Sequence, residues 1–196
     1  MRRLCVYAGA SVGIDPMFAD VARDLGELLA RSGIGLVYGG ASIGLMGAVA
    51  DAVLGAGGEA IGVIPTGLKR REVAHEGLSE LRTVGSMHER KATMSELADA
   101  FVALPGGLGT LDELLEAATW TQLGIHAKPC GLLNVGGYWD SLLAQLDRAG
   151  EDGFLRADHR RVLLVDSDPA ALLHRLSQWS PPPGIWRTSP SEAGLD

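Results

Sequence analysis

Apolar residues follow two different periods along the chain, one typical of strands and one typical of helices. Short apolar runs of β type recur without a clear alternation of polar residues, as in strands that are buried on both faces of a sheet. These runs predict strands at 3–9, 33–40, 59–65, 99–107, 130–135 and 161–167. Segments with the helical period lie between most of them and predict helices at 15–32, 44–56, 86–98, 109–123, 138–149 and 168–179.

Strands that alternate with helices favour a mainly parallel sheet, because each crossover must return the chain to the same end of the sheet. We therefore predict a Rossmann-like, doubly wound α/β fold with helices on both faces. Proline and a capping residue mark two of the helix starts, at Pro16 and at Asp168–Pro169. The segment 66–85 has many charges and no clean period, and we interpret it as a partly irregular loop over the strand ends.

The chain length suits one domain. With 196 residues, of which 46% are hydrophobic, the chain can bury a single sizeable core. We expect one domain over residues 1–180. The proline-rich segment 181–196 cannot easily continue a helix, and we expect a mobile tail there.

The charge and the cysteine content of the chain limit the kinds of partner and compartment that we expect. The 17 basic and 24 acidic residues leave a net charge of −7, which argues against a nucleic-acid surface, so an anionic ligand must be held by local donors. Cys5 and Cys130 lie in apolar runs, where reduced and buried thiols are the usual outcome. The N-terminus resembles a first strand and not a signal peptide, and no apolar stretch is long enough to span a bilayer. We therefore expect a cytoplasmic protein without a membrane partner.

Three strand exits are rich in glycine: "YAGASVG" at 7–13, "YGGASIGLMG" at 38–47 and "LPGGLGT" at 104–110. Open α/β sheets bind ligands beyond the carboxyl ends of their strands, so these exits are the places where a site is expected. None of them fits the GxGxxG dinucleotide fingerprint or the GxxxxGK[ST] loop of nucleoside-triphosphate hydrolases. The sequence therefore lacks the motifs that would indicate ordinary NAD binding or nucleoside-triphosphate hydrolysis.

The third exit suits a phosphate. Gly106, Gly107 and Gly109 would let backbone amides turn inward, and a helix that begins near Thr110 would add its positive end. Thr110 could cap that helix and also donate a hydrogen bond to a phosphate oxygen. A tight turn followed by a helix cap explains the same residues equally well.

The carboxylates that follow have different expected positions. If the helix begins near Thr110, Asp112 lies in its first turn, where the helix dipole favours a negative charge. Glu113 and Glu116 then share one face of the helix, and Glu113 points the way the glycine loop points. A solvated glutamate in the first turn is the structural alternative for Glu113.

A second motif, "SMHERK" at 86–91, precedes this loop by about twenty residues. Ser86 and Glu89 have the spacing of a capping box. Arg90 and Lys91 are cations near the first turn of a helix, where they oppose its dipole, so an anionic ligand or a neighbouring carboxylate should compensate them. No cysteine or second histidine stands near His88 at ligand spacing, so we predict no metal site.

Together, "MHERK" at 87–91 and "PGGLGTLDE" at 105–113 make the chain resemble the Lonely Guy (LOG) family, the cytokinin riboside 5′-monophosphate phosphoribohydrolases. The segments 38–52 and 119–143 and the first strand extend this resemblance over roughly residues 3–180. It implies hydrolysis of the N-glycosidic bond of a nucleoside 5′-monophosphate without a cofactor. Such proteins were often labelled lysine decarboxylases, but this chain is short and neither motif resembles a pyridoxal-phosphate lysine site.

The resemblance also implies roles for individual residues. Arg90 and Glu113 match the family's catalytic pair. The positions that match its nucleotide-binding residues are Lys91, Gly106, Gly107, Gly109 and Thr110, with Glu72 and Thr119 as secondary contacts. The first glycine exit departs from the family's common C-G-S, since Ala8 and Ala10 replace the cysteine and the first serine. This departure concerns the details of that loop and leaves the catalytic pair in place.

The chemistry of the reaction agrees with these residue types. Breaking a ribosyl N-glycoside develops positive charge on the sugar, which a carboxylate such as Glu113 can stabilise while it orients or deprotonates water. Arg90 suits binding of phosphate or polarisation of the leaving purine or ribose, because an arginine holds its proton too strongly to be a good general acid. Two alternatives stay open: a broader purine-monophosphate nucleosidase that acts on AMP, and a nucleotide-binding protein without turnover.

The resemblance finally implies a homodimer with the site close to its interface. The apolar residues of the two motif helices could form the contact face or belong to the core. They are Met94, Leu97, Leu115, Ala118, Trp120 and Leu123.

Overall fold

The structure is a computed structural model that describes residues 1–68 and 74–181. Glu72 and the predicted tail from residue 182 onward therefore lie outside the described residues. Within them, seven strands form one sheet in the order β4-β3-β2-β1-β5-β6-β7, and every neighbouring pair is parallel. The strands are β1 (Arg3–Tyr7), β2 (Gly35–Tyr38), β3 (Ala60–Pro65), β4 (Glu80–Val84), β5 (Ala100–Ala103), β6 (Cys130–Leu133) and β7 (Leu163–Asp166).

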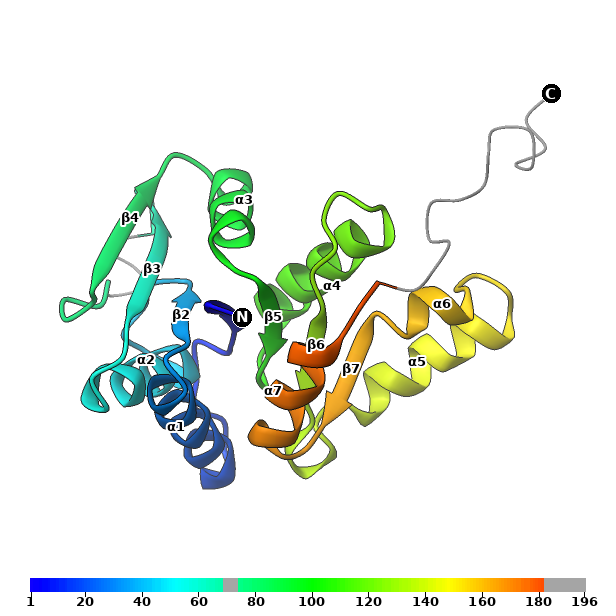
Figure 1. The fold of residues 1–196 in the computed structure, drawn as a ribbon, viewed down its shortest axis with the longest axis horizontal. Helices are drawn as coiled ribbons and strands as arrows, with labels where there is room; N and C mark the ends of the chain where they lie inside the picture. Colours follow the sequence, from blue (N-terminus) through cyan, green and yellow to red (C-terminus); the bar gives the residue numbers. More distant parts are fainter. Residues whose placement is uncertain (69–73, 182–196) are drawn as a thin grey trace.

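Helices cover both faces of this sheet, which confirms the predicted doubly wound α/β fold (Figure 1). They are α1 (Pro16–Arg31), α2 (Gly44–Gly55), α3 (Met87–Leu97), α4 (Leu108–Gln122), α5 (Asp140–Glu151), the short α6 (Ala157–Arg160) and α7 (Pro169–Gln178), with a 3₁₀ turn, η1 (Val135–Gly137). Side chains of α1, α2 and α7 form one half of the core, and those of α3, α4 and α5 form the other. The sheet separates the two halves.

Two helices, α1 and α7, begin at the proline and the capping residue that their sequences provide. Asp15 accepts a hydrogen bond from the Met17 N–H at 3.0 Å and is followed by Pro16. Asp168 accepts from the Ala171 N–H at 2.7 Å, again with a proline at the first helical position. Because these side chains replace missing backbone partners, they fix where each helix starts.

Strand β4 corrects the interpretation of segment 66–85 as a loop, because its last residues, Glu80–Val84, pair with β3. It lies at the edge of the sheet, where only one side of the strand is paired. Glu80 and Thr83 are exposed, and Arg82 forms an ion pair with Glu80. Charged residues are common on edge strands, and they hide the apolar pattern that identified the other six.

Both cysteines are free and fully buried, as their apolar surroundings predicted. Burial raises the pKa of Cys5 well above its ordinary value and raises the pKa of Cys130 to about 12. They therefore stay protonated at neutral pH and pack as small apolar side chains. None of the helices in the described part of the chain is long and apolar enough to cross a membrane.

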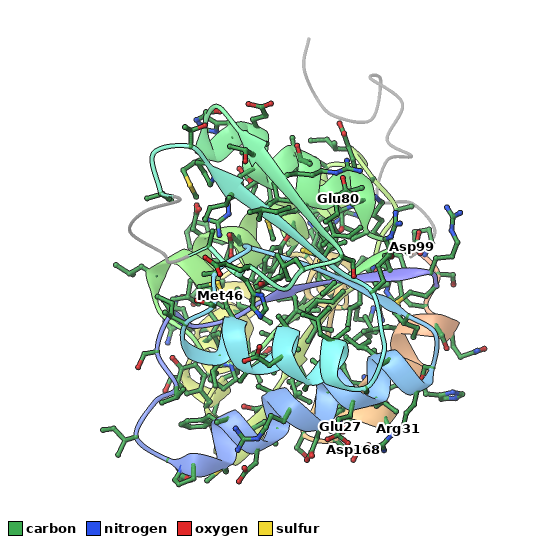
Figure 2. The ribbon with its side chains drawn as sticks, turned by 90° about the vertical axis from the view of Figure 1, so that its left-hand side faces the viewer. Glu27, Arg31, Met46, Glu80, Asp99 and Asp168 are labelled. Atoms are coloured by element: carbon green, nitrogen blue, oxygen red, sulfur yellow. The ribbon has the colours of Figure 1, made fainter. Side chains whose placement is uncertain are left out.

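The order of the strands reverses at β1, which pairs with β2 on one side and β5 on the other. The carboxyl ends of β1, β2 and β5 lead into the three glycine-rich exits, so the fold brings these exits to one edge of the sheet. Figure 2 shows Met46, at the start of α2, at this edge and Asp99, just before β5, at the opposite one. The figure also shows Glu27 and Arg31 on the outer side of α1, away from this edge.

Candidate functional site

A cleft of about 260 Å³ opens at the carboxyl ends of β1 and β5. Its lining combines residues from all three glycine exits with residues of α3 and α4: Ala8, Gly9, Ala10, Met46, Leu68, Met87, Arg90, Gly107, Gly109, Thr110, Asp112 and Glu113. The structure therefore brings Arg90, Glu113, Gly107, Gly109 and Thr110 to one place, although residues 91–106 separate Arg90 from Gly107 in the sequence.

Arg90 is held in the cleft by the exit of β2. Its side chain belongs to α3 and is only 4% exposed. Its Nη2 donates a hydrogen bond to the carbonyl oxygen of Gly39 at 3.0 Å. A Cβ at Gly39 would lie 2.1 Å from that nitrogen, so this position has no room for a side chain. The glycine pair in "YGGAS" is the sequence signal for this close approach.

The start of α3 shows how the "SMHERK" motif is built. Ser86 caps the helix and accepts a hydrogen bond from the Glu89 N–H at 3.1 Å, as predicted. The Glu89 carboxylate accepts from the Gly85 N–H at 2.6 Å, one residue before the bond that a capping box would have. This half of the motif is therefore structural and holds the helix that carries Arg90.

Helix α4 begins at Leu108, two residues before the predicted start near Thr110, and Gly107 is its N-cap. Thr110 is thus the third helical residue, and the expectation that it caps the helix was wrong. In the described part of the chain, no side chain caps this helix. The first helical bond runs from the Leu111 N–H to the Gly107 oxygen at 3.1 Å. The amides before Leu111 therefore have no partner within the helix, and they lie at the cleft together with the positive end of the helix dipole.

Helix α2 also begins at the cleft but is closed to a ligand. The Leu45 N–H donates to the carbonyl oxygen of Gly9 at 3.0 Å, so backbone from the β1 exit occupies the start of the helix. The Gly9 N–H in turn donates to the carbonyl oxygen of Pro105 at 3.0 Å. Between the starts of α2 and α4, that of α4 offers its amides to an anion. The start of α3, which contributes Met87 to the cleft, is capped by the Ser86 side chain.

Asp112 was predicted to lie in the first turn of α4. Because the helix begins earlier, Asp112 lies beyond that turn. Asp112 instead accepts a hydrogen bond from Lys91 Nζ at 3.2 Å, and Glu116 accepts one at 3.0 Å. Burial alone would lower the pKa of Lys91, but the bonds to Glu116 and Asp112 outweigh it and keep the pKa above its ordinary value. Neighbouring carboxylates therefore compensate Lys91, and it is not among the residues that line the cleft.

Glu113 lines the cleft from α4, on the wall that faces α3. Burial is the main reason why the pKa values of Cys5 and Tyr7 are raised, and the negative charge of Glu113 raises both further. The carboxylate therefore lies near the end of β1. Thr119 is exposed farther along α4 and does not line the cleft, and Glu72 lies outside the described residues.

A second hollow, of about 440 Å³, adjoins the first and shares Gly9, Ala10 and Gly107 with it. Its aromatic walls are Phe18 and Tyr138, whose ring centroids lie 5.8 Å apart in an edge-to-face contact. Sequence reasoning missed Tyr138. The signal was the stretch "NVGGYWD" directly after β6, which is a fourth strand exit with two glycines.

The residues described by the structure contain no group of three or more histidines, cysteines, aspartates or glutamates that could hold a metal ion. His88 is exposed on α3. The polar groups that line the cleft are the Arg90 guanidinium, the carboxylates of Glu113 and Asp112, backbone amides and the Thr110 hydroxyl. This set can bind an anion at one end and stabilise positive charge at the other.

Fold and cleft together define a Rossmann-like α/β protein in which an open helix start lies beside a buried arginine and a glutamate. Residues 46–176 match a family model described as "Possible lysine decarboxylase". LOGL9 of Oryza sativa subsp. japonica is 53% identical over 92% of this chain and 79% of its own length. The chain belongs to the family of cytokinin riboside 5′-monophosphate phosphoribohydrolases, the LOG family, as its motifs predicted.

Further relatives agree with this assignment, and solved structures share the fold. The cytokinin riboside 5′-monophosphate phosphoribohydrolase LOG of Oryza sativa subsp. japonica is 51% identical over 92% of this chain and 74% of its own length. The crystal structure of TM1055 superposes with a TM-score of 0.71 at 25% identity and covers 91% of this chain and 100% of that one. The molybdenum cofactor carrier protein of Chlamydomonas reinhardtii superposes with a TM-score of 0.68 and covers 90% of this chain and 96% of its own. At 21% identity, this likeness shows the shared fold alone.

Proposed function

We propose that this protein hydrolyses the N-glycosidic bond of an N6-substituted adenosine 5′-monophosphate, a cytokinin riboside 5′-monophosphate, to the free base and ribose 5-phosphate. The observation that carries the proposal is the placement of Arg90 and Glu113 in one cleft beside the open start of α4. The relatives at about half identity, whose names state this activity, support the choice of substrate.

The phosphate group occupies the start of α4 in this proposal. Gly107 and Gly109 have open space where a Cβ would be, so a phosphate oxygen can approach their backbone closely. The Thr110 hydroxyl adds a side-chain donor on the same wall. These local donors hold an anion even though the whole chain carries a net charge of −7.

The ribose lies next to Glu113. As the bond to the base breaks, positive charge develops at the anomeric carbon, and the carboxylate stabilises this charge. Glu113 also orients the attacking water and accepts its proton. Glu113 then gives this proton up to the departing base, directly or through solvent, so that the products are ribose 5-phosphate and the neutral free base and the carboxylate is restored.

Arg90 acts by binding and polarisation. A guanidinium group is a poor proton donor, so Arg90 does not act as a general acid. Its guanidinium group, held by the Gly39 carbonyl, is positioned to stabilise negative charge on the phosphate or on the leaving purine. Met46, Leu68 and Met87 supply apolar surface in the same cleft, which suits a purine ring. The proposed reaction needs no cofactor.

We also propose that the protein is a cytoplasmic homodimer whose contact face includes the outer side of α4. Leu115 and Leu123 are 39% and 46% exposed there. Met94 is fully buried in the core and cannot contribute to such a face, whereas Leu97 and Ala118 are half-buried against the core. The variant Leu115→Glu should yield a monomer in sedimentation experiments, and a matched change at the fully exposed Ile14, just before α1, Ile14→Glu, should not.

A comparison of three substrates tests the proposed reaction. The protein is incubated with isopentenyladenosine 5′-monophosphate, AMP and unphosphorylated isopentenyladenosine, and free base is followed by chromatography. We expect base from the first substrate at the highest rate and little from the riboside. Faster release from AMP would indicate a broader purine-monophosphate nucleosidase. Release from none of the three, with nucleotide binding intact, would indicate a binding protein without turnover.

A further inference from the structure

The hydroxyl group of Tyr138 donates a hydrogen bond to the carbonyl oxygen of Gly106 at 2.6 Å. We propose that Tyr138 is a positioning residue that orients the peptide between Gly106 and Gly107, so that its N–H faces the phosphate group of the substrate. The inference rests on the proposed function and deepens it, because it explains how the glycine loop recognises a phosphorylated ligand. Tyr138 comes from the exit of β6 and not from the motifs that mark the cleft.

Peptide geometry links the hydroxyl to the cleft. All peptide bonds between described residues are trans, and in a planar trans peptide the C=O and N–H groups point in opposite directions. Because Tyr138 holds the Gly106 oxygen, the Gly107 N–H points away from Tyr138. The tyrosine lines the second hollow, whereas Gly107 also lines the catalytic cleft, together with Gly109 and Thr110.

The two glycines explain why the orientation of this peptide must be held by a hydrogen bond. The peptide between Gly106 and Gly107 has no Cβ on either side, so it can flip at little steric cost. In the flipped orientation its carbonyl oxygen would face the anion and repel it. The preceding carbonyl, that of Pro105, already accepts from the Gly9 N–H at 3.0 Å. Two successive carbonyl groups are thus held by donors outside the phosphate position.

Tyr138 itself is fixed by the turn in which it lies. The adjacent Trp139 is 2% exposed, and its N–H donates to the Asn134 side chain at 2.7 Å. Gly137 has a φ of +72°, a left-handed conformation that few other residues adopt. The Phe18 and Tyr138 rings pack against each other in an edge-to-face contact. The hydroxyl is therefore presented to Gly106 by a structured element.

The variant Tyr138→Phe tests the proposal, since it removes the hydroxyl and keeps the ring. We expect KM for the nucleoside 5′-monophosphate to rise about fivefold to tenfold, the loss that one hydrogen bond to the loop implies, with little change in kcat. The Kd for ribose 5-phosphate, measured by calorimetry, should rise by the same factor. Turnover of the unphosphorylated riboside should stay at the wild-type level, which a general structural defect would not allow.

Tyr38→Phe is the matched control. It removes a buried hydroxyl that has no hydrogen-bond partner among the described residues, and we expect wild-type KM and Kd values. An unchanged KM in Tyr138→Phe would overturn the proposal. Equal losses of activity toward the nucleotide and the riboside would also overturn it, because they would show a structural role.

Binding measurements separate this proposal from the proposed reaction. If the wild-type protein releases no base, the hydrolase assignment fails, and the Kd values for AMP and ribose 5-phosphate still report on Tyr138. Weaker binding of both ligands by Tyr138→Phe would then support the positioning role in a binding protein. Equal binding by the variant and the wild type would reject it.

Discussion

Lys91 of α3 and Glu116 of α4 form a hydrogen-bonded ion pair, with 3.0 Å between Nζ and Oε1. The lysine side chain is only 10% exposed and also contacts Asp112. The neighbouring residue on α3 is Arg90, and Glu113 lies one helical turn before Glu116 on α4. The pair therefore connects the two helices that carry the proposed catalytic residues.

Replacing Lys91 by methionine should loosen this connection. We expect the free energy of unfolding in urea to fall by about 1–2 kcal/mol, because two carboxylates lose their partner while remaining partly solvated. We also expect kcat/KM to fall about tenfold as Arg90 and Glu113 lose their fixed separation. The smaller change Asp112→Asn, which removes one of two partners, should have a smaller effect on both. If Lys91 binds the nucleotide directly instead, stability would stay nearly constant and KM alone would rise.

Glu113→Gln should abolish most of the activity and leave binding intact. The amide cannot stabilise positive charge on the ribose or take a proton from water, so we expect kcat to fall about 100-fold to 1000-fold. Calorimetry should show AMP binding within about threefold of wild type, since the phosphate donors are unchanged. The control Glu116→Gln alters a carboxylate one turn away that contacts Lys91. Comparable losses in kcat from both variants would argue against a special role for Glu113.

Two glycines of the loop should respond differently to alanine. A Cβ at Gly106 would lie 2.1 Å from Thr110 Oγ1 and 2.9 Å from the Gly9 nitrogen, so we expect Gly106→Ala to destabilise the fold by about 1–3 kcal/mol. A Cβ at Gly109 would meet nothing within 4 Å, and Gly109→Ala should unfold at the same or a slightly higher urea concentration. Equal stabilities of the two variants in urea titrations would contradict the close packing of Gly106 against Thr110.

His126 should make the fold sensitive to acid. Burial, with a contribution from the charge of Lys128, lowers its pKa to about 4, below the value of about 6.5 in an unfolded chain. Between these values the unfolded chain binds a proton that the folded chain excludes, so the free energy of unfolding falls as the pH drops from about 6.5 to about 4. We expect a loss on the order of 1–2 kcal/mol, less than the full shift implies, because the ring is only half-buried.

Urea titrations at pH 7 and pH 5 can check this sign. His126→Gln should reduce the loss of stability between the two pH values. His174→Gln, which changes an exposed histidine on α7, should preserve it. A wild-type protein that is equally stable at both pH values would refute the expectation for His126.

The periodic parts of the fold could be predicted because a single physical signal governs them. Fully buried strands such as β5 and β6 contain no charged residues that could disguise them, and helices such as α1 carry their own caps. Edge strand β4 lacks this signal, because it contains the charged residues Glu80 and Arg82, which form an ion pair at the surface. Its pairing depends on β3, which is distant in the sequence.

The cleft could be predicted in its residue types and less well in its contacts. Glycine spacing and the motif at 87–91 identified both walls. The start of α4 was placed too late because prediction relied on a side-chain cap, whereas Gly107 has none to offer. The partners of Lys91 and the role of Tyr138 depend on how α3, α4 and the β6 exit approach in three dimensions, which a linear pattern does not record.

Gly9 joins the two halves of the sheet at the cleft, with its N–H bonded to Pro105 and its carbonyl bonded to the start of α2. A motion that widened the cleft by parting the β1–β4 half from the β5–β7 half would strain the bond to Pro105, while the bond to α2 holds Gly9 within its own half. Ligands should therefore enter and leave a cleft of nearly constant width. Selection among nucleotides would then depend on how well each one fits the fixed width of the cleft, and not on a closing movement that follows binding.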